Sequence, residues 1–255
     1  MRFMTIPHLF ILTGGSRGMG LSMARQLLAP GHTLLCISRT ESPALAQHAR
    51  QADACLLQWC HDLADSSAPG TRLEGWLREQ GGTDWHSATL INNAGVIAHI
   101  GPLSQADPAD LAHALRVGLE APMLLTSAFL RATEGWKAER RVLNISSGLG
   151  RRPMASQAGY CAAKAGMDHF SRCVALEEAL KTGGAKICSL APGVIDTSMQ
   201  LQLRSAPQDA FPDRDSFARL KTGGQLTEPG EAARRVLAWL ARPDFGAQPV
   251  ADVRD

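Results

Sequence analysis

The sequence predicts an α/β protein built on one doubly wound parallel sheet, with helices on both faces. Short aliphatic or β-branched runs alternate with longer amphipathic segments along the whole chain, which is typical of successive βαβ units. The length of 255 residues suits one domain with a sizeable core. No internal repeat or low-complexity linker divides the chain, so we expect a single domain over residues 1–255.

Each predicted element follows from its own residues. Seven short apolar runs are expected as strands, at 8–13, 33–38, 54–59, 88–92, 140–146, 185–191 and 249–253. Amphipathic stretches are expected as helices, at about 18–29, 43–51, 66–80, 107–134, 155–181 and 228–241. The sheet should therefore contain seven strands.

Residues 197–226 do not fit the alternation, because they are rich in Gln, Ser, Pro, Asp and Gly. They follow the sixth predicted strand, on the side where open α/β sheets bind ligands. Long ordered loops in compact domains are usually functional, so we predict a substrate lid; the alternative is a surface insertion without a role. The apolar residues of this stretch would either cover a ligand or form the buried side of a short helix: Met199, Leu201, Leu203, Phe211, Phe217 and Leu220.

Composition narrows the classes of partner and compartment. The formal net charge is +2 and no basic run is interleaved with aromatics, so we expect neither a nucleic-acid nor a membrane partner. The apolar start at 9–12 is too short for a signal peptide or membrane span, and we expect a cytoplasmic protein. The six cysteines show no CxxC spacing and no matching histidine cluster, so we expect buried free thiols and no metal site.

A glycine-rich turn joins the first predicted strand to the first helix, with the sequence TGGSRGMG over residues 13–20. Glycines there permit a tight turn and let backbone N–H groups approach a pyrophosphate, which the helix N-terminus also attracts. An ordinary loop is the alternative, but the position directly after an apolar run favours a dinucleotide site. The candidate cofactor-binding residues of the turn are Gly14, Ser16, Arg17, Gly18, Met19 and Gly20.

The end of the second predicted strand bears on which dinucleotide is bound. NAD enzymes commonly place an acidic residue there, whereas this chain has Ser38 and Arg39, with Arg17 nearby in the glycine turn. Two guanidinium groups would bind a 2′-phosphate through charge-assisted hydrogen bonds of about 1.5–3 kcal/mol each. We therefore predict NADP(H), with solvated surface arginines as the alternative.

Tyr160 and Lys164 are candidates for proton transfer. They are four residues apart on a predicted helix, which places both on one face, and Tyr160 is the only tyrosine of the chain. A phenol there would give a proton to a carbonyl oxygen as hydride reaches carbon. Bringing its pKa from near 10 to about 7 requires ~4 kcal/mol of anion stabilisation, which a nearby ammonium and a positive nicotinamide ring would supply.

These motifs, in this order, resemble the short-chain dehydrogenase/reductase family over essentially the whole chain. The resemblance rests on the glycine turn and on Asn92-Asn93-Ala94-Gly95, Asp62-Leu63, Tyr160-Cys-Ala-Ala-Lys164, and Pro192-Gly193 with Thr197. It implies a Rossmann-type domain that transfers hydride between NADP(H) and a small carbonyl or alcohol.

The resemblance also implies roles for individual residues. Asp62 and Leu63 would contact the adenine, and Asn93, Ala94 and Gly95 the adenosine ribose. The nicotinamide would be surrounded by Pro192, Gly193, Val194, Ile195 and Thr197. Ser147, thirteen residues before Tyr160, would hold the substrate oxygen, Ser146 would be a strand-end residue, and Lys164 would also bind the nicotinamide ribose. Ordinary turn chemistry is the alternative for residues such as Asp62 and Pro192-Gly193.

Gly118 departs from the family pattern. Many members have an asparagine there, in a setting like Arg-Val-Asn-x-x-x-Pro, and its side chain helps hold a water that relays protons to the lysine; this chain reads Arg116-Val-Gly-Leu-Glu-Ala-Pro122. Two hypotheses follow. Backbone carbonyls hold the water in the space that Gly118 vacates, which we favour, or the protein binds NADP(H) and catalyses poorly.

A looser resemblance to sepiapterin reductases and bacterial benzil reductases rests on the runs 145–148, 158–168, 192–200 and 250–254. It implies reduction of an α-dicarbonyl or aryl ketone. The alternatives are a 3-oxoacyl carrier-protein reductase, for which Arg151-Arg152 is the one basic feature near the cleft, and an NADP(H)-binding sensor with weak or no turnover. Family members usually associate through the two long helices, so a homodimer or homotetramer is expected, although those helices would also suit packing on the sheet alone.

Overall fold

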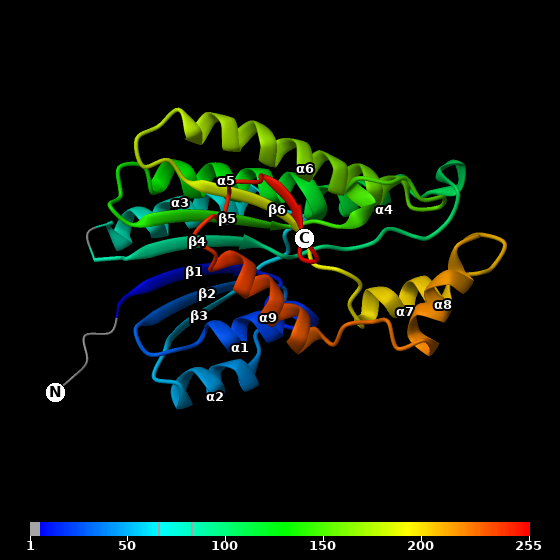
Figure 1. The fold of residues 1–255 in the computed structure, drawn as a ribbon, viewed down its shortest axis with the longest axis horizontal. Coiled ribbons are helices and arrows are strands. Elements are labelled where there is room, and N and C mark those ends of the chain that lie inside the picture. Colours follow the sequence, from blue (N-terminus) through cyan, green and yellow to red (C-terminus); the bar gives the residue numbers. More distant parts are fainter. Residues whose placement is uncertain (1–5, 66, 83) are drawn as a thin grey trace.

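A computed structural model describes residues 6–65, 67–82 and 84–255, and contains one sheet of seven parallel strands (Figure 1). The strands are β1 (His8–Thr13), β2 (His32–Ser38), β3 (Cys55–Cys60), β4 (Ser87–Asn92), β5 (Glu139–Ile145), β6 (Lys186–Ala191) and β7 (Val250–Asp252). They lie in the order β3-β2-β1-β4-β5-β6-β7. The predicted fold class is confirmed.

Helices cover both faces of the sheet. They are α1 (Gly18–Leu27), α2 (Pro43–Gln51), α3 (Ser67–Gln80), α4 (Pro108–Leu115), α5 (Ala121–Ala132), α6 (Ala158–Ala179), α7 (Ser198–Ser205), α8 (Arg214–Thr222) and α9 (Pro229–Leu240). Residue 66, the first of the predicted helix 66–80, lies outside the described residues. In Figure 1, α1, α2 and α9 lie on one face of the sheet, and α3 to α6 on the other.

The strands are apolar because both of their faces are buried. All six residues of β4 and five of the six in β1 are buried, as expected for a parallel sheet covered on both sides. One core cluster joins the sheet to α1 and α9 through residues such as Met23 and Val236. A second joins it to α3, α5 and α6 through Leu73, Phe129 and Val174.

The predicted helix 107–134 is not one continuous α-helix. A π-helical turn, Arg116–Glu120, separates α4 from α5, and the Ala121 N–H donates to the carbonyl of Arg116, five residues earlier. Pro122 gives a physical reason, because it has no N–H to donate to the carbonyl of Gly118, four residues before it. Single π-turns within helices often lie at functional sites.

The stretch 197–226 contains α7 and α8, which project beyond the carboxyl ends of the strands (Figure 1). Leu203, Phe211 and Phe217 are buried together with Ile100 in a third core cluster. Leu203 of α7 and Phe217 of α8 therefore form the buried sides of short helices, one of the two alternatives that the sequence had left open, while Phe211 is buried in the loop between them. Leu201 is 56% exposed and does not contribute to that cluster.

The cysteines differ from expectation. All six are free, and Cys36 and Cys188 are buried, which raises the pKa of these thiols to about 12 and about 11. Cys55, Cys60 and Cys173 are exposed. The prediction of buried thiols was wrong for these three, because their positions on β3 and α6 face outward. Within the described ranges, no helix is long and apolar enough to cross a membrane.

Candidate active site

A cleft of about 830 Å³ lies at the carboxyl ends of the strands. The strand order reverses between β1 and β4, and in open α/β sheets ligands bind at such a switch point. The turn after β1 and the loops after β2 to β6 line the cleft. Every candidate site residue predicted from the sequence lines it except Lys164, which lies behind the wall.

The glycine turn approaches the cleft through its backbone. Gly14 and Gly18 have φ angles of +70° and +55°, a region that favours glycine. A Cβ on Gly20 would lie 2.1 Å from the carbonyl oxygen of Gly14. The start of α1 therefore packs against the turn with no room for side chains, and its free N–H groups face a site suited to an anion.

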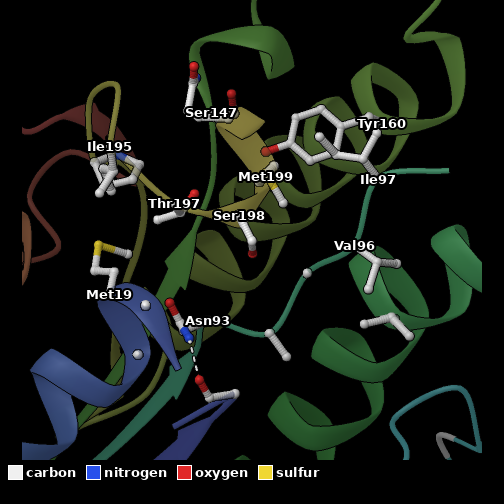
Figure 2. A pocket seen from close by; sticks show the side chains of 18 of the residues that line it. Met19, Asn93, Val96, Ile97, Ser147, Tyr160, Ile195, Thr197, Ser198 and Met199 are labelled. Atoms are coloured by element: carbon white, nitrogen blue, oxygen red, sulfur yellow. Dashed lines mark hydrogen bonds between the residues drawn. The ribbon is translucent and has the colours of Figure 1, made fainter. Parts of the chain in front are cut away.

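Thr13 and Asn93 join the ends of β1 and β4. The Thr13 hydroxyl oxygen accepts hydrogen bonds from the backbone N–H groups of Asn93 and Ala94, each 2.9 Å long. The Asn93 side-chain amide donates to the Thr13 carbonyl at 2.9 Å. Figure 2 shows Asn93 on the Met19 side of the cleft. This role of Thr13 was not predicted from the sequence, although Thr13 is the first residue of the glycine turn.

Arg17 and Arg39 lie exposed at the same end of the cleft. Neither guanidinium has a hydrogen bond or ion pair to another residue in the described part of the chain. Ser38, at the end of β2, has a buried hydroxyl without a partner among the described residues. This end of the cleft is cationic, and β2 ends on a hydroxyl where NAD enzymes commonly have a carboxylate.

The two residues predicted at the adenine differ in setting. Asp62 is exposed and accepts a hydrogen bond from the N–H of Ala64. This is a turn hydrogen bond, the alternative to adenine binding that the sequence had left open for Asp62. Leu63 is buried at the cleft wall. Beyond β6, Pro192 to Ile195 and Thr197 line the opposite wall, and Ile195 and Thr197 lie together in Figure 2.

Ser147 and Tyr160 meet on the far side of the cleft. Ser147 directly follows Ser146 at the end of β5, and its hydroxyl oxygen accepts from the N–H of Leu149 at 3.2 Å. The Ser147 hydroxyl lies near the Tyr160 hydroxyl and acts to lower the pKa of that phenol, and the Tyr160 hydroxyl points into the cleft (Figure 2). Burial raises the pKa of Tyr160 above its ordinary value, and Ser147 opposes this only in part. The surroundings of Tyr160 thus favour the neutral phenol over the phenolate. Lowering its pKa toward 7 therefore requires added positive charge.

Lys164 is buried beneath Tyr160. Its side chain lies 4% exposed, and its Nζ donates to the carbonyl oxygen of Ile145 at 2.7 Å. The Nζ is 5.8 Å from the centre of the Tyr160 ring. Burial lowers the pKa of Lys164 to about 8, while the negative charge of Asp168 opposes the shift. The buried amine therefore changes its charge closer to neutral pH than an exposed lysine would.

Several cleft residues were not predicted from the sequence. Val96 and Ile97 follow the Asn-Asn-Ala-Gly run directly and lie at the Tyr160 end in Figure 2. His113, Leu149, Gln157, Asp252 and Arg254 also line the cleft. Only sequence proximity to a motif could have suggested some of them. Met199 and Arg152 line the cleft too, and the sequence had placed Met199 in the proposed lid and Arg152 near the cleft. No group of His, Cys, Asp and Glu in residues 6–65, 67–82 and 84–255 is arranged to hold a metal ion.

Gly118 is buried in the π-turn against α6. A Cβ built on it would lie 3.2 Å from the Cβ of Ala163, the neighbour of Lys164, with no other atom of its surroundings within 4 Å. The departure from the expected asparagine thus coincides with close helix packing beside the lysine.

Comparison with known proteins agrees with this arrangement. Residues 8–208 match the family described as short chain dehydrogenase. The chain is 37% identical to benzil reductase ((S)-benzoin forming) of Bacillus cereus, over 92% of this chain and 94% of that protein. It is 31% identical to sepiapterin reductase of Mus musculus, over 96% of each. The crystal structure of a short-chain dehydrogenase/reductase from Burkholderia vietnamiensis is 36% identical, covers 97% of both chains and superposes with a TM-score of 0.65. The chain belongs to the short-chain dehydrogenase family of oxidoreductases, which bind nicotinamide cofactors and act on small molecules.

Proposed function

We propose that the protein is an NADPH-dependent carbonyl reductase in which Tyr160 is the acid. The observation that carries the proposal is the convergence of Ser147, Tyr160 and Lys164 at the end of β5. Ser147 lies close enough to Tyr160 to lower the pKa of the phenol, and the Lys164 amine lies 5.8 Å from the centre of the Tyr160 ring. A polarising hydroxyl, a proton donor and a cation together suit proton delivery to a carbonyl oxygen.

The cofactor preference rests on charge. Arg17 and Arg39 are exposed at the cleft without protein partners among the described residues, and Ser38 replaces the usual carboxylate. Two guanidinium groups suit a 2′-phosphate, and the glycine turn suits the pyrophosphate. The walls after β3, β4 and β6 would hold the adenine, its ribose and the nicotinamide. When bound, the dihydronicotinamide supplies the hydride.

The chain's own residues would do the rest of the chemistry. Ser147 would donate a hydrogen bond to the substrate oxygen and place it beside the Tyr160 hydroxyl. Tyr160 would give that oxygen its proton. Lys164 would stabilise the phenolate left behind, which burial otherwise disfavours. Lys164 would also bind the nicotinamide ribose if its Nζ turned from the Ile145 carbonyl.

Proton resupply to Lys164 would involve the Gly118 turn. Because Pro122 cannot donate to the Gly118 carbonyl, that oxygen lacks its usual α-helical donor and would accept from the Met123 N–H, five residues later, or from a water. This supports the hypothesis that backbone carbonyls hold the relay water where relatives have an asparagine side chain.

The proposed substrate is an α-diketone or aryl ketone. The Tyr160 end of the cleft has apolar walls, including Ile97, Leu149, Met199 and Phe217, and the Bacillus cereus relative is a benzil reductase. The segment 197–226 supplies Met199 and Phe217, and would act as a lid over an apolar ligand.

Two alternatives have weaker support. A carrier-protein reductase would need a basic surface, but Arg151 is engaged with Asp168 and with the carbonyl of Ala251, which leaves Arg152 alone. An NADP(H)-binding sensor is motivated by Gly118 only.

The proposed association is a homodimer or homotetramer through α4–α5 and α6. Met123, Leu124, Leu176 and Leu180 are exposed apolar residues on these helices or at their ends, which supports it. Other apolar residues of α6 contribute less to this surface, because Ala163, Met167 and Val174 are buried within the subunit.

The deciding experiment follows NADPH absorbance as wild-type protein meets a panel of α-diketones and aryl ketones. Turnover that is lost in Tyr160→Phe is expected, with NADH a poor substitute. The double variant Arg17→Gln/Arg39→Gln should weaken NADPH binding far more than NADH binding. Equal losses would overturn the NADP assignment, and NADPH binding without turnover on any ketone would favour the sensor.

A further inference from the structure

A buried polar cluster lies directly behind the proposed catalytic residues. Asp168 follows Lys164 by one turn of α6 and is 2% exposed. One of its carboxylate oxygens accepts from the hydroxyl of Ser146 at 2.6 Å and from the hydroxyl of Ser189 at 2.7 Å. The other accepts from the Nε of Arg151 at 3.1 Å. The carboxylate is thus held by three donors and does not line the cleft.

The cluster ties together the elements that carry the site. Ser146 stands between Ile145, whose carbonyl accepts from Lys164, and Ser147, which lies beside Tyr160 and lowers the pKa of its phenol. Ser189 belongs to β6, and Arg151 also donates to the carbonyl of Ala251 on β7 at 2.7 Å. Asp168 therefore joins α6 to the ends of β5 and β6 directly, and to β7 through Arg151.

Within the described part of the chain, the Nζ of Lys164 donates to the Ile145 carbonyl and to the Met167 sulfur, and to no carboxylate. Titratable or charged groups do lie on every element packed against this part of α6. They are Tyr160 and Asp168 on α6, Arg151 after the turn at 148–150, Cys188 on β6, Asp252 and Arg254 at β7, Asp110 and His113 on α4, and Arg116 and Glu120 on the π-turn. Among the described residues, Asp168 is the one carboxylate whose charge acts on the Lys164 amine, in the direction that favours its protonated form.

We propose that Asp168 is a positioning residue: it fixes the β5 end that presents Ser147 and the Ile145 carbonyl, and its charge holds Lys164 in the ammonium form. Arg151 sets the strength of this effect, because its guanidinium neutralises part of the carboxylate charge. The inference rests on the proposed roles of Ser147, Tyr160 and Lys164, and adds a group that touches neither cofactor nor substrate.

The first test reads Lys164 directly. The chain has five lysines, so protein labelled with carbon-13 at the lysine Cε gives few signals, and Lys164→Met identifies the one that matters. In wild type this signal should titrate near pH 8. In Asp168→Asn the pH at the midpoint of this titration should fall by about one pH unit. In Arg151→Gln it should rise, because the carboxylate loses its counter-charge.

Glu177→Gln is the matched control, since it removes one negative charge from an exposed position on the same helix. Its Lys164 midpoint should equal that of wild type. An unchanged midpoint in Asp168→Asn, a fall in Arg151→Gln, or an equal fall in Glu177→Gln would overturn the charge role. If Asp168→Asn does not fold, the charge role is tested by Arg151→Gln alone. The Lys164 midpoint should rise in that variant and stay unchanged in Glu177→Gln.

The second test concerns turnover. The alkaline limb of kcat should move to lower pH in Asp168→Asn and to higher pH in Arg151→Gln, whereas a merely structural role would lower kcat equally at every pH. NADPH binding should stay within about threefold of wild type, roughly 0.7 kcal/mol at 1.4 kcal/mol per tenfold. Full turnover in Tyr160→Phe would defeat the proposed function while leaving the NMR result standing, so the two failures are distinguishable.

Discussion

The Nζ of Lys164 lies 2.7 Å from the carbonyl oxygen of Ile145, across the packing of α6 against the end of β5. A single carbonyl dipole does not replace the water that a buried ammonium loses, so burial lowers the pKa of Lys164 to about 8. The fold thus carries an electrostatic cost at the place where the proposed chemistry needs a cation.

That cost predicts a pH-dependent stability change in Lys164→Met. The lysine has a lower pKa in the folded state than the model-peptide value of 10.5, so the folded protein disfavours the ammonium. Below about pH 8 both states are protonated and the penalty is complete; between about 8 and 10.5 the folded state alone loses the proton and the penalty disappears. Lys164→Met should therefore raise the free energy of unfolding by about 1–3 kcal/mol at neutral pH.

Urea unfolding at neutral pH and at a pH above 10.5 measures this difference. The gain should shrink as the pH rises through this window, and wild type should itself gain stability relative to the variant. A gain that is the same at both pH values, or a loss at neutral pH, would contradict the buried charge.

Thr13→Val should weaken the joint between β1 and β4. The Thr13 hydroxyl accepts from two backbone N–H groups, those of Asn93 and Ala94, and valine would leave both without that acceptor. Unpaired buried donors cost about 1–3 kcal/mol, and NADPH binding should weaken as the two loops separate. Thr13→Ser keeps the hydroxyl and is the control in both urea unfolding and cofactor titration; equal effects of the two variants would exclude the hydrogen bonds as the cause.

Two glycine-to-alanine substitutions should change the free energy of unfolding in opposite directions. In Gly20→Ala the new Cβ would lie 2.1 Å from the Gly14 carbonyl oxygen, so the glycine turn must move, with a loss of about 1–3 kcal/mol and weaker NADPH binding. Gly75 is exposed within α3 and has nothing within 4 Å of a built Cβ. Gly75→Ala should stabilise the protein by about 0.5–1 kcal/mol with NADPH binding unchanged. Thermal unfolding and cofactor titration of both variants check the pair.

Gly118→Asn tests both the packing and the relay. The built Cβ is 3.2 Å from the Cβ of Ala163, so the single variant should lose about 1–2 kcal/mol of stability. Ala163→Gly in the same chain opens the space, although glycine in a helix costs about 1 kcal/mol, so the double variant should lose no more than the single one. With folding matched in this way, a higher kcat would mean that the asparagine improves the relay. A rate unchanged within error would make this position irrelevant to proton transfer.

Much of the fold was predictable because local patterns control it. Strands buried on both faces must be apolar, and the runs that begin β1 and β4 could be located without tertiary information. The single helix predicted over 107–134 was wrong because Pro122 and the π-turn change the hydrogen bonding while the apolar period continues. The exposure of Cys55 and Cys60 was also missed, since whether β3 lies at an edge depends on the strand order.

The sequence by itself determined the α/β alternation, the glycine turn after β1 and the four-residue spacing that places Tyr160 and Lys164 on one helix face. It did so because each of these depends on neighbours along the chain. Only the tertiary structure brought Ser147 to Tyr160, Thr13 to Asn93, and Asp168 to Ser146, Ser189 and Arg151. Those contacts join segments distant in sequence, and the strand order and the packing of α6 on the sheet decide them. The same packing buries Lys164, and that burial, which no motif records, lowers its pKa to about 8.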